Sequence, residues 1–590
     1  MEVPVVVVRL GAVLLSAALV AAACTATPEP TTTITTLGTT TTLPPVPTTT
    51  EPPITYARGG VAVIAEDEEP TTLNPYVRGG EEQIVSTIGQ AYFIGVSDVD
   101  GETLELIPEV VTELPTTSNE GVVVNDDGTM TVHYTIREEA MWEDGVPISG
   151  DDFAFTLETL QGTRAHAGYR IDEVYGWIDS FEASPKAFSF TLNRPTILHE
   201  QLFRVLLPEH VVEGSDFAGD WNDTMWPSGG PFRLAEWVRG DRLTVERNPN
   251  YWKTNPESSQ QLPLLDAVEF RFIVNLEETL AALGAREIDI FELPSQVSAI
   301  DELLAASAPG VGVDVREGPV WEHLSFQFGP SRLEVNEGTL NDDLEFRRAV
   351  AHLVDREAIA AIVSPHATAL SSYVDPFVPA LSHQSWDRYT YDPEAASEIL
   401  ERLRNEAGVE AITAVFTTSN RGDVRVQMSE ALRAMFEAVG ISYENRLQDP
   451  QVFYGPTLQE GKWDLGQWAW VGTPGMSWLV GIHDVFDPDG MPPRGSNYYR
   501  WGTEDSSVVD EYTERFANIR DLMNASVDDA QLVDLFAEAE EMLADQMVIL
   551  PLYREPAIAV VWDDEITGFV HNPSPASYTW NMEDWRRADL

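Results

Sequence analysis

The chain is poor in cysteine, lysine and long apolar runs. Cys24 is its one cysteine among 590 residues, which excludes a disulfide framework and leaves the burial of apolar surface to stabilise the fold. The 36 Lys and Arg residues stand against 96 Asp and Glu residues, so the formal net charge is -60. Because phosphate binding requires a basic surface, this balance argues against a nucleic-acid partner. Beyond residue 23, no apolar run is long enough to cross a membrane.

The acidic excess has two explanations that the sequence leaves open. Acidic surfaces keep proteins hydrated and soluble in a salty habitat. Alternatively, the charge reflects ordinary solubility together with a codon bias that favours arginine over lysine. A preference for cationic ligands is a weaker hypothesis, because the acidic residues are spread along the whole chain.

The N-terminal segment has the layout of an exported lipoprotein. The apolar run Leu10–Ala23 ends in Ala21-Ala22-Ala23-Cys24, which resembles a bacterial lipobox, and a Thr/Pro-rich tract follows. We predict a signal peptide over 1–23, lipid on Cys24 and a disordered tether over 24–56, because the tract has too few apolar residues to form a core. An uncleaved membrane anchor is the alternative, since the apolar segment from Val3 onward is about long enough to span a bilayer.

From residue 57 onward, strand and helix patterns mix without a repeat, which predicts α and β structure in one body. Ser149 with Asp152, and Ser526 with Asp529, are candidate pairs for capping the start of a helix. Strands are predicted over 61–65, 122–124, 130–136, 231–237, 243–247 and 548–553, and helices after Ser149, over 277–284 and 344–354, and after Ser526.

The usual signatures of catalysis are missing from the sequence. It contains no G-x-x-x-x-G-K-[ST] phosphate loop, no H-E-x-x-H, no G-x-S-x-G and no S-x-x-K. The ten His residues are scattered without metal-ligand spacing. Asp487-Pro-Asp-Gly490 resembles a fragment of a calcium loop, but the third ligand and the closing Glu are absent, so we predict a polar turn. We therefore expect a protein that is not an enzyme and has no cofactor and no metal.

Tryptophan is concentrated late in the chain, where five of the 16 Trp residues lie within 463–501. Trp468 and Trp470 are spaced to lie on one face of a strand, and residues 472–475 then turn the chain. A strand end that delivers aromatic side chains to a loop is typical of a pocket wall. An aromatic core strand is the alternative for this pair. For Trp478, which the pattern assigns to the loop, we favour the pocket.

Several sequence blocks occur in the order that one known family has. They are Glu69-Pro-Thr-Thr-Leu-Asn-Pro-Tyr76, Tyr134-Thr-Ile-Arg137 with Trp142-Glu-Asp-Gly145, Leu207-Pro-Glu-His210, Gly229-Gly-Pro-Phe-Arg-Leu234, Glu246-Arg-Asn-Pro-Asn-Tyr-Trp252, Phe346-Arg-Arg-Ala-Val350 and Ile549-Leu-Pro-Leu-Tyr553. Together they resemble the family 5 extracellular solute-binding proteins of ABC transporters, the group of oligopeptide, dipeptide and nickel binders. The resemblance covers nearly everything from Arg58 to the C-terminus.

This resemblance implies an α/β, type II periplasmic-binding-protein fold with two lobes and an extra inserted domain, three domains in all. The implied boundaries are 57–85, 205–312 and 549–590 for a discontinuous first lobe, 86–204 for the inserted domain, and 313–548 for the second lobe.

The resemblance also implies where a ligand is held. The implied ligand-binding residues are Asn74, Tyr76, Tyr92, Trp321, Trp468, Trp470, Trp478 and Tyr498. Peptide-binding members place an Asp just after the Trp that corresponds to Trp470, where it pairs with the α-ammonium of the peptide. Here the loop is Val471-Gly-Thr-Pro-Gly475, and the next acid after Trp470 is Asp484. A modified peptide, a sugar or another polar solute therefore stays open beside an ordinary peptide.

The implied function is that of an extracytoplasmic, lipid-anchored monomer that captures a peptide or peptide-like solute between its lobes. It would deliver this solute to an integral-membrane ABC permease with its ATPase. One alternative is a receptor for a sugar or another polar solute, and a second is a binder without a transporter, used for sensing or adhesion. An anchored polysaccharide hydrolase is the weakest alternative, because the catalytic motifs are missing.

Overall fold

The computed structural model describes residues 54–163, 173–295, 300–373, 384–420 and 422–590. By its contacts the chain divides into Met1–Pro53 and Ile54–Leu590. The predicted signal peptide, Cys24 and almost all of the predicted tether therefore lie outside the described residues. Within the described ranges, no helix combines the length and the apolar character that a bilayer crossing needs.

The principal sheet of the described residues has eleven strands and mixes parallel with antiparallel pairs, which confirms the predicted α/β class. Ten of its strands lie in the order β15 (Ser442–Gln448), β14 (Thr413–Ser419), β16 (Leu465–Val471), β12 (Gly312–Phe326), β17 (Ile549–Val561), β11 (Ile290–Leu293), β1 (Val61–Glu66), β10 (Ala267–Phe272), β9 (Arg242–Arg247) and β8 (Phe232–Val238), and β13 (Thr368–Ala369) pairs with β17. The predicted strand over 61–65 and the predicted hairpin, here β8 and β9, are both present.

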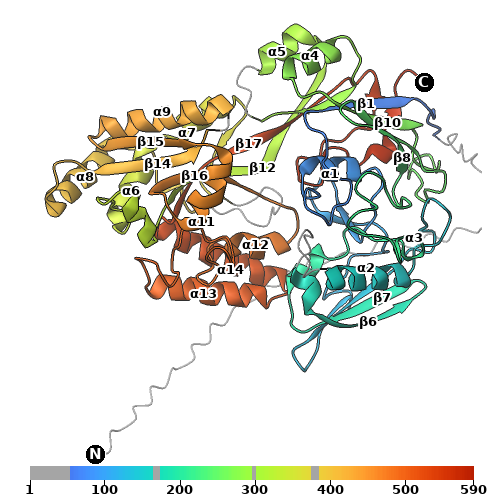
Figure 1. The fold of residues 1–590 in the computed structure, drawn as a ribbon, viewed down its shortest axis with the longest axis horizontal. Coiled ribbons are helices and arrows are strands. Elements are labelled where there is room, and N and C mark those ends of the chain that lie inside the picture. The colour runs from blue at the N-terminus through green and yellow to red at the C-terminus, as the bar shows by residue number, and fades with distance from the viewer. Residues whose placement is uncertain (1–53, 164–172, 296–299, 374–383, 421) are drawn as a thin grey trace, which may run out of the picture. The chain divides into compact units, whose positions relative to one another are not determined.

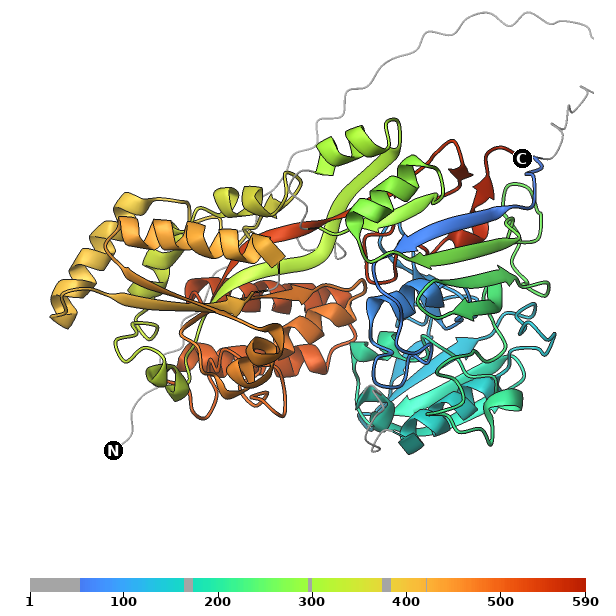
Figure 2. The ribbon, with the colours of Figure 1, turned by 45° about the horizontal axis from the view of Figure 1, so that its top comes forward.

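Two long strands, β12 and β17, join the two halves of this sheet (Figures 1 and 2). They pair with each other in antiparallel fashion, while β17 also pairs with β11 and β12 also pairs with β16. Ile549 and Leu550 of β17 pack in the apolar cluster that contains Trp468, whereas Ile558 and Val560 pack in a different cluster. The boundaries proposed at 312/313 and 548/549 thus fall at strands that both halves share.

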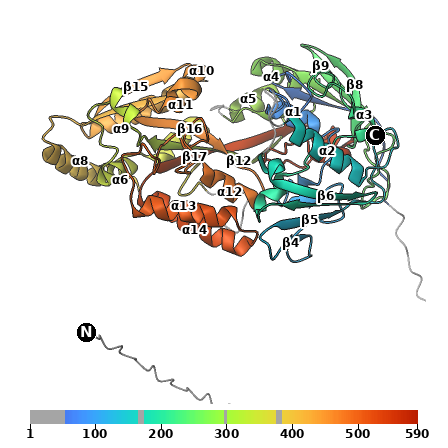
Figure 3. The ribbon, with the colours of Figure 1, turned by 60° about the horizontal axis from the view of Figure 1, so that its bottom comes forward.

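A separate four-stranded sheet forms the centre of the region proposed as the inserted domain. Its order is β4 (Val122–Val124), β5 (Met130–Thr135), β7 (Ala187–Leu192) and β6 (Ile178–Ser184), and α2 (Gly150–Thr163) packs on it (Figure 3). The predicted hairpin of β4 and β5 is confirmed. So is the predicted cap, because the Asp152 carboxylate accepts a hydrogen bond from the Ser149 N–H at 2.9 Å.

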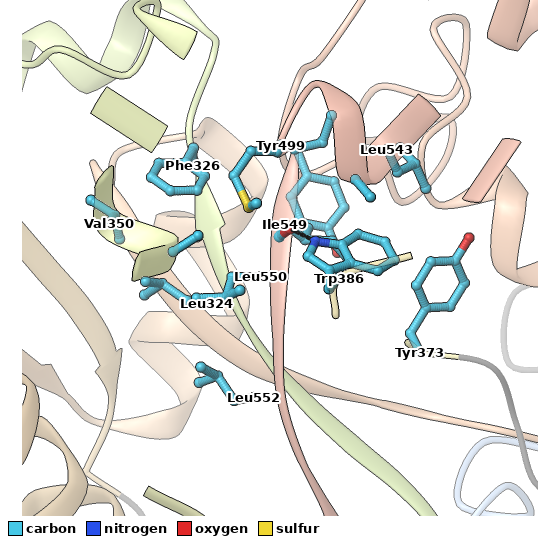
Figure 4. Packing of buried hydrophobic residues seen from close by; sticks show 14 of the residues in the cluster. Leu324, Phe326, Val350, Tyr373, Trp386, Tyr499, Leu543, Ile549, Leu550 and Leu552 are labelled. Carbon is cyan, nitrogen blue, oxygen red and sulfur yellow. Dashed lines mark hydrogen bonds between the residues drawn. The ribbon is translucent and has the colours of Figure 1, made fainter. Parts of the chain in front are cut away.

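Helices cover the sheets, and α12, α13 and α14 pack against one another on one side of the predicted second lobe (Figure 1). Their bounds are α1 Gln83–Gly89, α3 Glu209–Val212, α4 Leu276–Gly284, α5 Ile300–Ser307, α6 Leu344–Leu353, α7 Arg356–Val363, α8 Pro393–Ala407, α9 Gly422–Ala438, α10 Pro450–Val452, α11 Leu458–Glu460, α12 Ser477–Asp484, α13 Glu511–Asn524 and α14 Asp529–Asp545. Leu543 of α14 packs with Ile549 of β17, Trp386 and Tyr373 in the largest apolar cluster (Figure 4).

The start of α14 differs from the prediction. Its N-cap is Asp528, whose carboxylate accepts a hydrogen bond from the Gln531 N–H at 3.0 Å. Ser526 lies two residues earlier, and its hydroxyl accepts from the Asp528 N–H at 3.2 Å. A carboxylate interacts more favourably than a hydroxyl with the positive end of the helix dipole, which explains why Asp528 takes the capping position.

Candidate functional site

The implied ligand-binding residues divide into a buried and an accessible group. Five of them expose 4 % or less of their surface, namely Asn74, Tyr92, Trp321, Trp468 and Trp478. Tyr76, Trp470 and Tyr498 are half-buried and keep accessible surface. In this structure, only the second group presents side chains that a solute can reach.

The loop after β1 uses its polar side chains to hold the fold together. The Asn74 side-chain amide donates to the Phe217 carbonyl at 2.8 Å, and its oxygen accepts from the Tyr76 N–H at 3.0 Å. The Tyr76 hydroxyl donates to the Val205 carbonyl at 2.6 Å. These contacts satisfy the polar atoms of Asn74 and Tyr76 internally, so both residues act here as structural ties between the loop and the segment 205–217.

Trp468 and Trp470 share one face of β16, as their spacing predicted, but their surroundings differ. Trp468 stacks on Tyr499, with 5.3 Å between ring centroids, and lies inside the main apolar cluster. Trp470 stacks on Tyr498 at 6.1 Å with an interplanar angle of 12°. Its indole N–H donates to the Tyr499 hydroxyl at 2.8 Å. Trp468 is therefore a residue of the aromatic core, which was the alternative to a pocket wall. Trp470 keeps an accessible aromatic face, but its indole N–H is already hydrogen-bonded.

Trp321 and Trp478 do not form a pocket wall in the structure. Trp321 lies in β12 and stacks on Tyr373 at 5.3 Å. Trp478 was expected on a loop, but α12 begins at Ser477, so the side chain turns inward against Phe536. The loop is shorter than predicted because helix α12 follows directly after the turn at 472–475.

A cavity of about 270 Å³ opens where three parts of the chain meet. It is lined by the end of α1 with Gln90, by Asp98 of β2 (Ser97–Val99), by Arg204, by 230–231, and by Thr473 and Pro474 from the loop after β16. In the proposed domain scheme these segments come from the first lobe, the inserted domain and the second lobe. A solute in this cavity touches all three.

Two cationic side chains line the cavity, and they differ in their ion-pair partners. Lys253 is held by the carboxylates of Glu109 at 2.8 Å and Glu583 at 3.1 Å, so its charge is matched. Arg204 makes no hydrogen bond and no ion pair within the described residues, although its side chain is exposed to the cavity. Burial of the surrounding site lowers the pKa of Arg204 from its ordinary value, and the guanidinium nevertheless stays charged at neutral pH.

Asp98 gives the cavity a carboxyl group that titrates near neutral pH. Burial, and then the neighbouring charge of Glu109, raise the pKa of Asp98 to about 7. Its carboxylate accepts from the Val99 N–H at 2.7 Å and from the Gln90 side-chain amide at 3.4 Å. Near neutral pH, Asp98 is therefore only partly ionised and only partly offsets the charge of Arg204.

A second cavity, of about 560 Å³, shares Ser97 with the first. Its walls are largely apolar and include Leu104, Leu106 and Leu114 together with Met476 after the β16 loop. Glu200 also lines it and accepts from the Ser477 N–H at 2.9 Å, which links the inserted region to α12.

Burial raises the pKa of Glu200 to about 7, so this second cavity also loses negative charge as the pH falls toward 6. Within the described residues, no group of three or more His, Cys, Asp or Glu side chains is placed to hold a metal ion.

Sequence reasoning missed Arg204, Asp98 and Gln90. One signal was available for Arg204, because it is an isolated cation inside the apolar run Leu202–Leu207. A charge in such a run has either a buried partner or a role at a surface. Asp98 had no comparable signal, since one acid among 96 acidic residues does not stand out.

Comparisons with known proteins agree with this architecture. The family model described as "Bacterial extracellular solute-binding proteins, family 5 Middle" matches residues 105–479. The oligopeptide-binding protein OppA of Mycobacterium tuberculosis is 24% identical over 544 residues, which cover 84% of this chain and 82% of that protein.

Two solved structures illustrate the similarity of fold. The periplasmic EDTA-binding protein EppA has a TM-score of 0.73 at 20% identity, covering 91% of this chain and 98% of that one. The oligopeptide-binding protein AppA of Bacillus subtilis, in complex with a nonapeptide, has a TM-score of 0.64 at 17% identity, covering 90% of this chain and 99% of that one. The fold is thus the predicted type II periplasmic-binding-protein fold.

Proposed function

Because the chain belongs to the bacterial extracellular solute-binding proteins of family 5, we propose that it captures a peptide or peptide-like solute and delivers it to an ABC permease. The family itself works outside the cytoplasm and binds solutes.

The cavity lined by Gln90, Asp98, Arg204 and the 473–474 segment is the observation that carries this proposal. Its walls come from segments far apart in the sequence, so a bound solute would tie the proposed lobes to one another. Ligand contacts that exist only when the lobes are closed stabilise the closed state over the open one. A permease could then distinguish the loaded receptor from the empty one by its surface.

The named relatives support the peptide-like class. OppA and AppA are described as oligopeptide-binding proteins, and EppA as an EDTA-binding protein. Peptides and EDTA are flexible polar molecules that carry carboxylates. A site with an arginine that has no partner among the described residues, beside a partly neutralised aspartate, suits such molecules better than a purely acidic site does.

Titration of the full chain with a library of short peptides tests the proposal. We expect a change in tryptophan fluorescence, because Trp470 lies near the end of β16, just before the cavity wall at 473–474. We also expect a smaller radius of gyration by scattering. A library that changes neither signal would contradict peptide capture.

A sugar or another stacked polar solute is the second candidate. The half-buried pair of Trp470 and Tyr498 favours it, since a nearly parallel aromatic stack presents a flat face to a ring. The absence of an acid between Trp470 and Asp484 points the same way. The same titration with mono- and oligosaccharides separates the two classes, and product analysis in these samples also tests the hydrolase alternative.

We also propose that lipid on Cys24 holds the receptor at the outer face of the membrane, with 24–56 as its tether. A tether raises the local concentration of a receptor near its permease without a new contact. Cys24→Ala should release the protein from the membrane fraction and leave solute affinity unchanged. Retention of the variant in the membrane would contradict the lipid anchor.

A further inference from the structure

We propose that the short 3₁₀ helix η2 (Ile197–Gln201) is a pH-sensitive latch. It holds the region proposed as the inserted domain against the proposed second lobe, and it weakens as the pH rises. The latch consists of contacts within this chain, so it acts whichever solute the protein takes. Its centre is the place where η2 packs against α12.

η2 extends from the inserted region into the core of the other part. The Thr196 hydroxyl caps η2 by accepting a hydrogen bond from the Leu198 N–H at 3.2 Å, which fixes the turn locally. Ile197 exposes only 4 % of its surface and packs in the apolar cluster that also contains Trp478 and Leu479 of α12. Leu198 packs against both this cluster and the cluster of the inserted region.

Glu200 gives α12 a hydrogen-bond acceptor that the helix lacks locally. The N-cap residue of α12 is Met476, and its side chain makes no capping hydrogen bond. Instead, the Glu200 carboxylate, 277 residues away in the sequence, accepts from the Ser477 N–H at 2.9 Å. A carboxylate at this end of a helix also interacts favourably with the helix dipole. The cap of α12 therefore depends on contact with the inserted region.

The charges around Glu200 make this contact sensitive to pH. Burial raises the pKa of Glu200 from 4.5 to about 7, and the Ser477 N–H offsets only part of the rise. Asp529, at the start of α14, repels the ionised carboxylate, whereas Arg204 attracts it. The other titratable side chains of the adjoining 560 Å³ cavity are Glu105, Tyr134 and His199. Burial lowers the pKa of His199, so its ring is neutral near pH 7.

The direction of the pH effect follows from the loss of water at Glu200. In the docked arrangement its pKa is about 7, and when the two parts separate the carboxyl returns to water and to a pKa near 4.5. The docked state therefore binds the proton more tightly, and protonation favours docking. Between about pH 4.5 and 7 docking weakens as the pH rises, because an ionised carboxylate must then be held away from water beside Asp529.

The distance between two spin labels tests the latch in the absence of solute. Cys24→Ala removes the one native cysteine, and Ser180→Cys on β6 with Ala434→Cys on α9 place the labels at exposed positions. Pulsed electron resonance on this full-length parent chain measures the docked and separated populations. We expect their ratio to fall about 10-fold from pH 5.5 to pH 8, within what a pKa change from 4.5 to about 7 allows.

Variants of the parent chain separate the latch from other effects of pH. Glu200→Gln keeps an acceptor but does not titrate, so it should abolish this 10-fold change. Glu200→Ala has no acceptor and should lower the docked population at pH 5.5. Asp529→Asn should raise the docked population at pH 8, while Asp534→Asn, at an exposed acid of the same helix that lines neither cavity, should not.

Three results would overturn the latch. They are an equal pH dependence in the parent chain and in Glu200→Gln, an unchanged docked population in Glu200→Ala, and a single distance at both pH values in the parent chain. The parent chain alone gives the last result, so a folding defect in a variant, checked by circular dichroism, cannot decide it. Because no solute is present, a failure of the latch leaves peptide capture standing, and a failure of peptide capture leaves the latch standing.

Discussion

Two arginines, Arg425 and Arg204, lie in regions of the molecule that differ in the partners they provide for a cation. Arg425 lies in the proposed second lobe, where it pairs with the fully buried Glu322 and donates to the Thr418 hydroxyl at 3.1 Å. Gln467 donates to the other oxygen of Glu322 at 2.7 Å. Arg204 lines a cavity and has no partner within the described part of the chain.

The difference separates a structural charge from one that is available for recognition. A buried ion pair is held by its own hydrogen bonds, and breaking it leaves a charge without compensation. An unpaired cation in an open cavity stays hydrated and can exchange water for a ligand. An arginine therefore contributes to the stability of the fold at Arg425 and is available for ligand recognition at Arg204.

The same substitution at both arginines should give the largest difference. Arg425→Met leaves Glu322 buried without its cation, and we expect a loss of about 3–5 kcal/mol in the free energy of unfolding. Arg204→Met should change it by less than about 1 kcal/mol. Urea unfolding at pH 8 measures both, because Glu322, whose pKa burial raises to about 7, is mostly ionised at this pH in the wild type. Equal losses would remove the distinction between the two regions.

The two tryptophans of β16 extend the comparison to apolar groups. Trp468→Ala empties a site in the core, and we expect a cost of about 3–5 kcal/mol. Trp470→Ala removes a half-buried ring and one hydrogen bond, so its cost should be about 1–2 kcal/mol. Thermal unfolding of both variants checks the order. A Trp470 variant as unstable as the Trp468 variant would show that Trp470 belongs to the core.

Glu540 tests how a buried carboxyl behaves when its partners are hydroxyls. It lies on α14, is fully buried, and accepts from the hydroxyls of Ser372 and Ser385. Burial raises its pKa to about 7 from the ordinary 4.5. The folded state then binds more protons than the unfolded state between these values, so this group destabilises the fold as the pH rises from about 4.5 to 7.

Glu540→Gln should therefore flatten the pH dependence. We expect the stability of the wild type relative to this variant to fall by about 1–3 kcal/mol between pH 5 and pH 8. Urea unfolding at four pH values measures this difference. Ser385→Ala is a matched control that keeps the carboxyl and should keep the slope. A difference independent of pH would show that Glu540 does not titrate in this range.

Tyr499→Phe tests a single buried hydrogen-bonded group and should have a modest effect. The Tyr499 hydroxyl donates to the ring nitrogen Nε2 of His323 at 2.8 Å and accepts from the Trp470 indole. Burial lowers the pKa of His323 to about 3, so the ring is neutral and can accept. We expect a loss of about 1–2 kcal/mol, as for buried polar groups left without a partner, together with a shift in Trp470 emission. Unchanged stability and emission would contradict this link.

Patterns of local origin were predictable from the sequence. The strand at 61–65, both hairpins and the cap of α2 follow from apolar alternation, turn residues and capping pairs, and all are present. The family blocks supplied the fold, because several motifs in one order are far more specific than any single motif.

Features that depend on tertiary partners were not predictable. The strand predicted over 548–553 continues to Val561. Arg554 and Glu555 interrupt the apolar run, but the strand accommodates them because the Arg554 side chain donates to the Gly318 carbonyl and the Glu555 carboxylate accepts from the Ser295 hydroxyl. The resemblance implied a ligand contact for Trp321, but a family motif does not say that the side chain is fully buried in this chain, where it stacks on Tyr373. The position of Arg204 in a ligand-sized cavity could not be predicted, because segments far apart in the sequence form that cavity.

The most direct test of the central claim is a structure of the full chain with the tightest-binding peptide of the library bound. We predict that the peptide lies in the cavity beside Asp98 and the 473–474 segment and accepts a hydrogen bond of about 3 Å from the Arg204 guanidinium. A peptide bound elsewhere, or one that makes no contact with Arg204, would contradict this prediction.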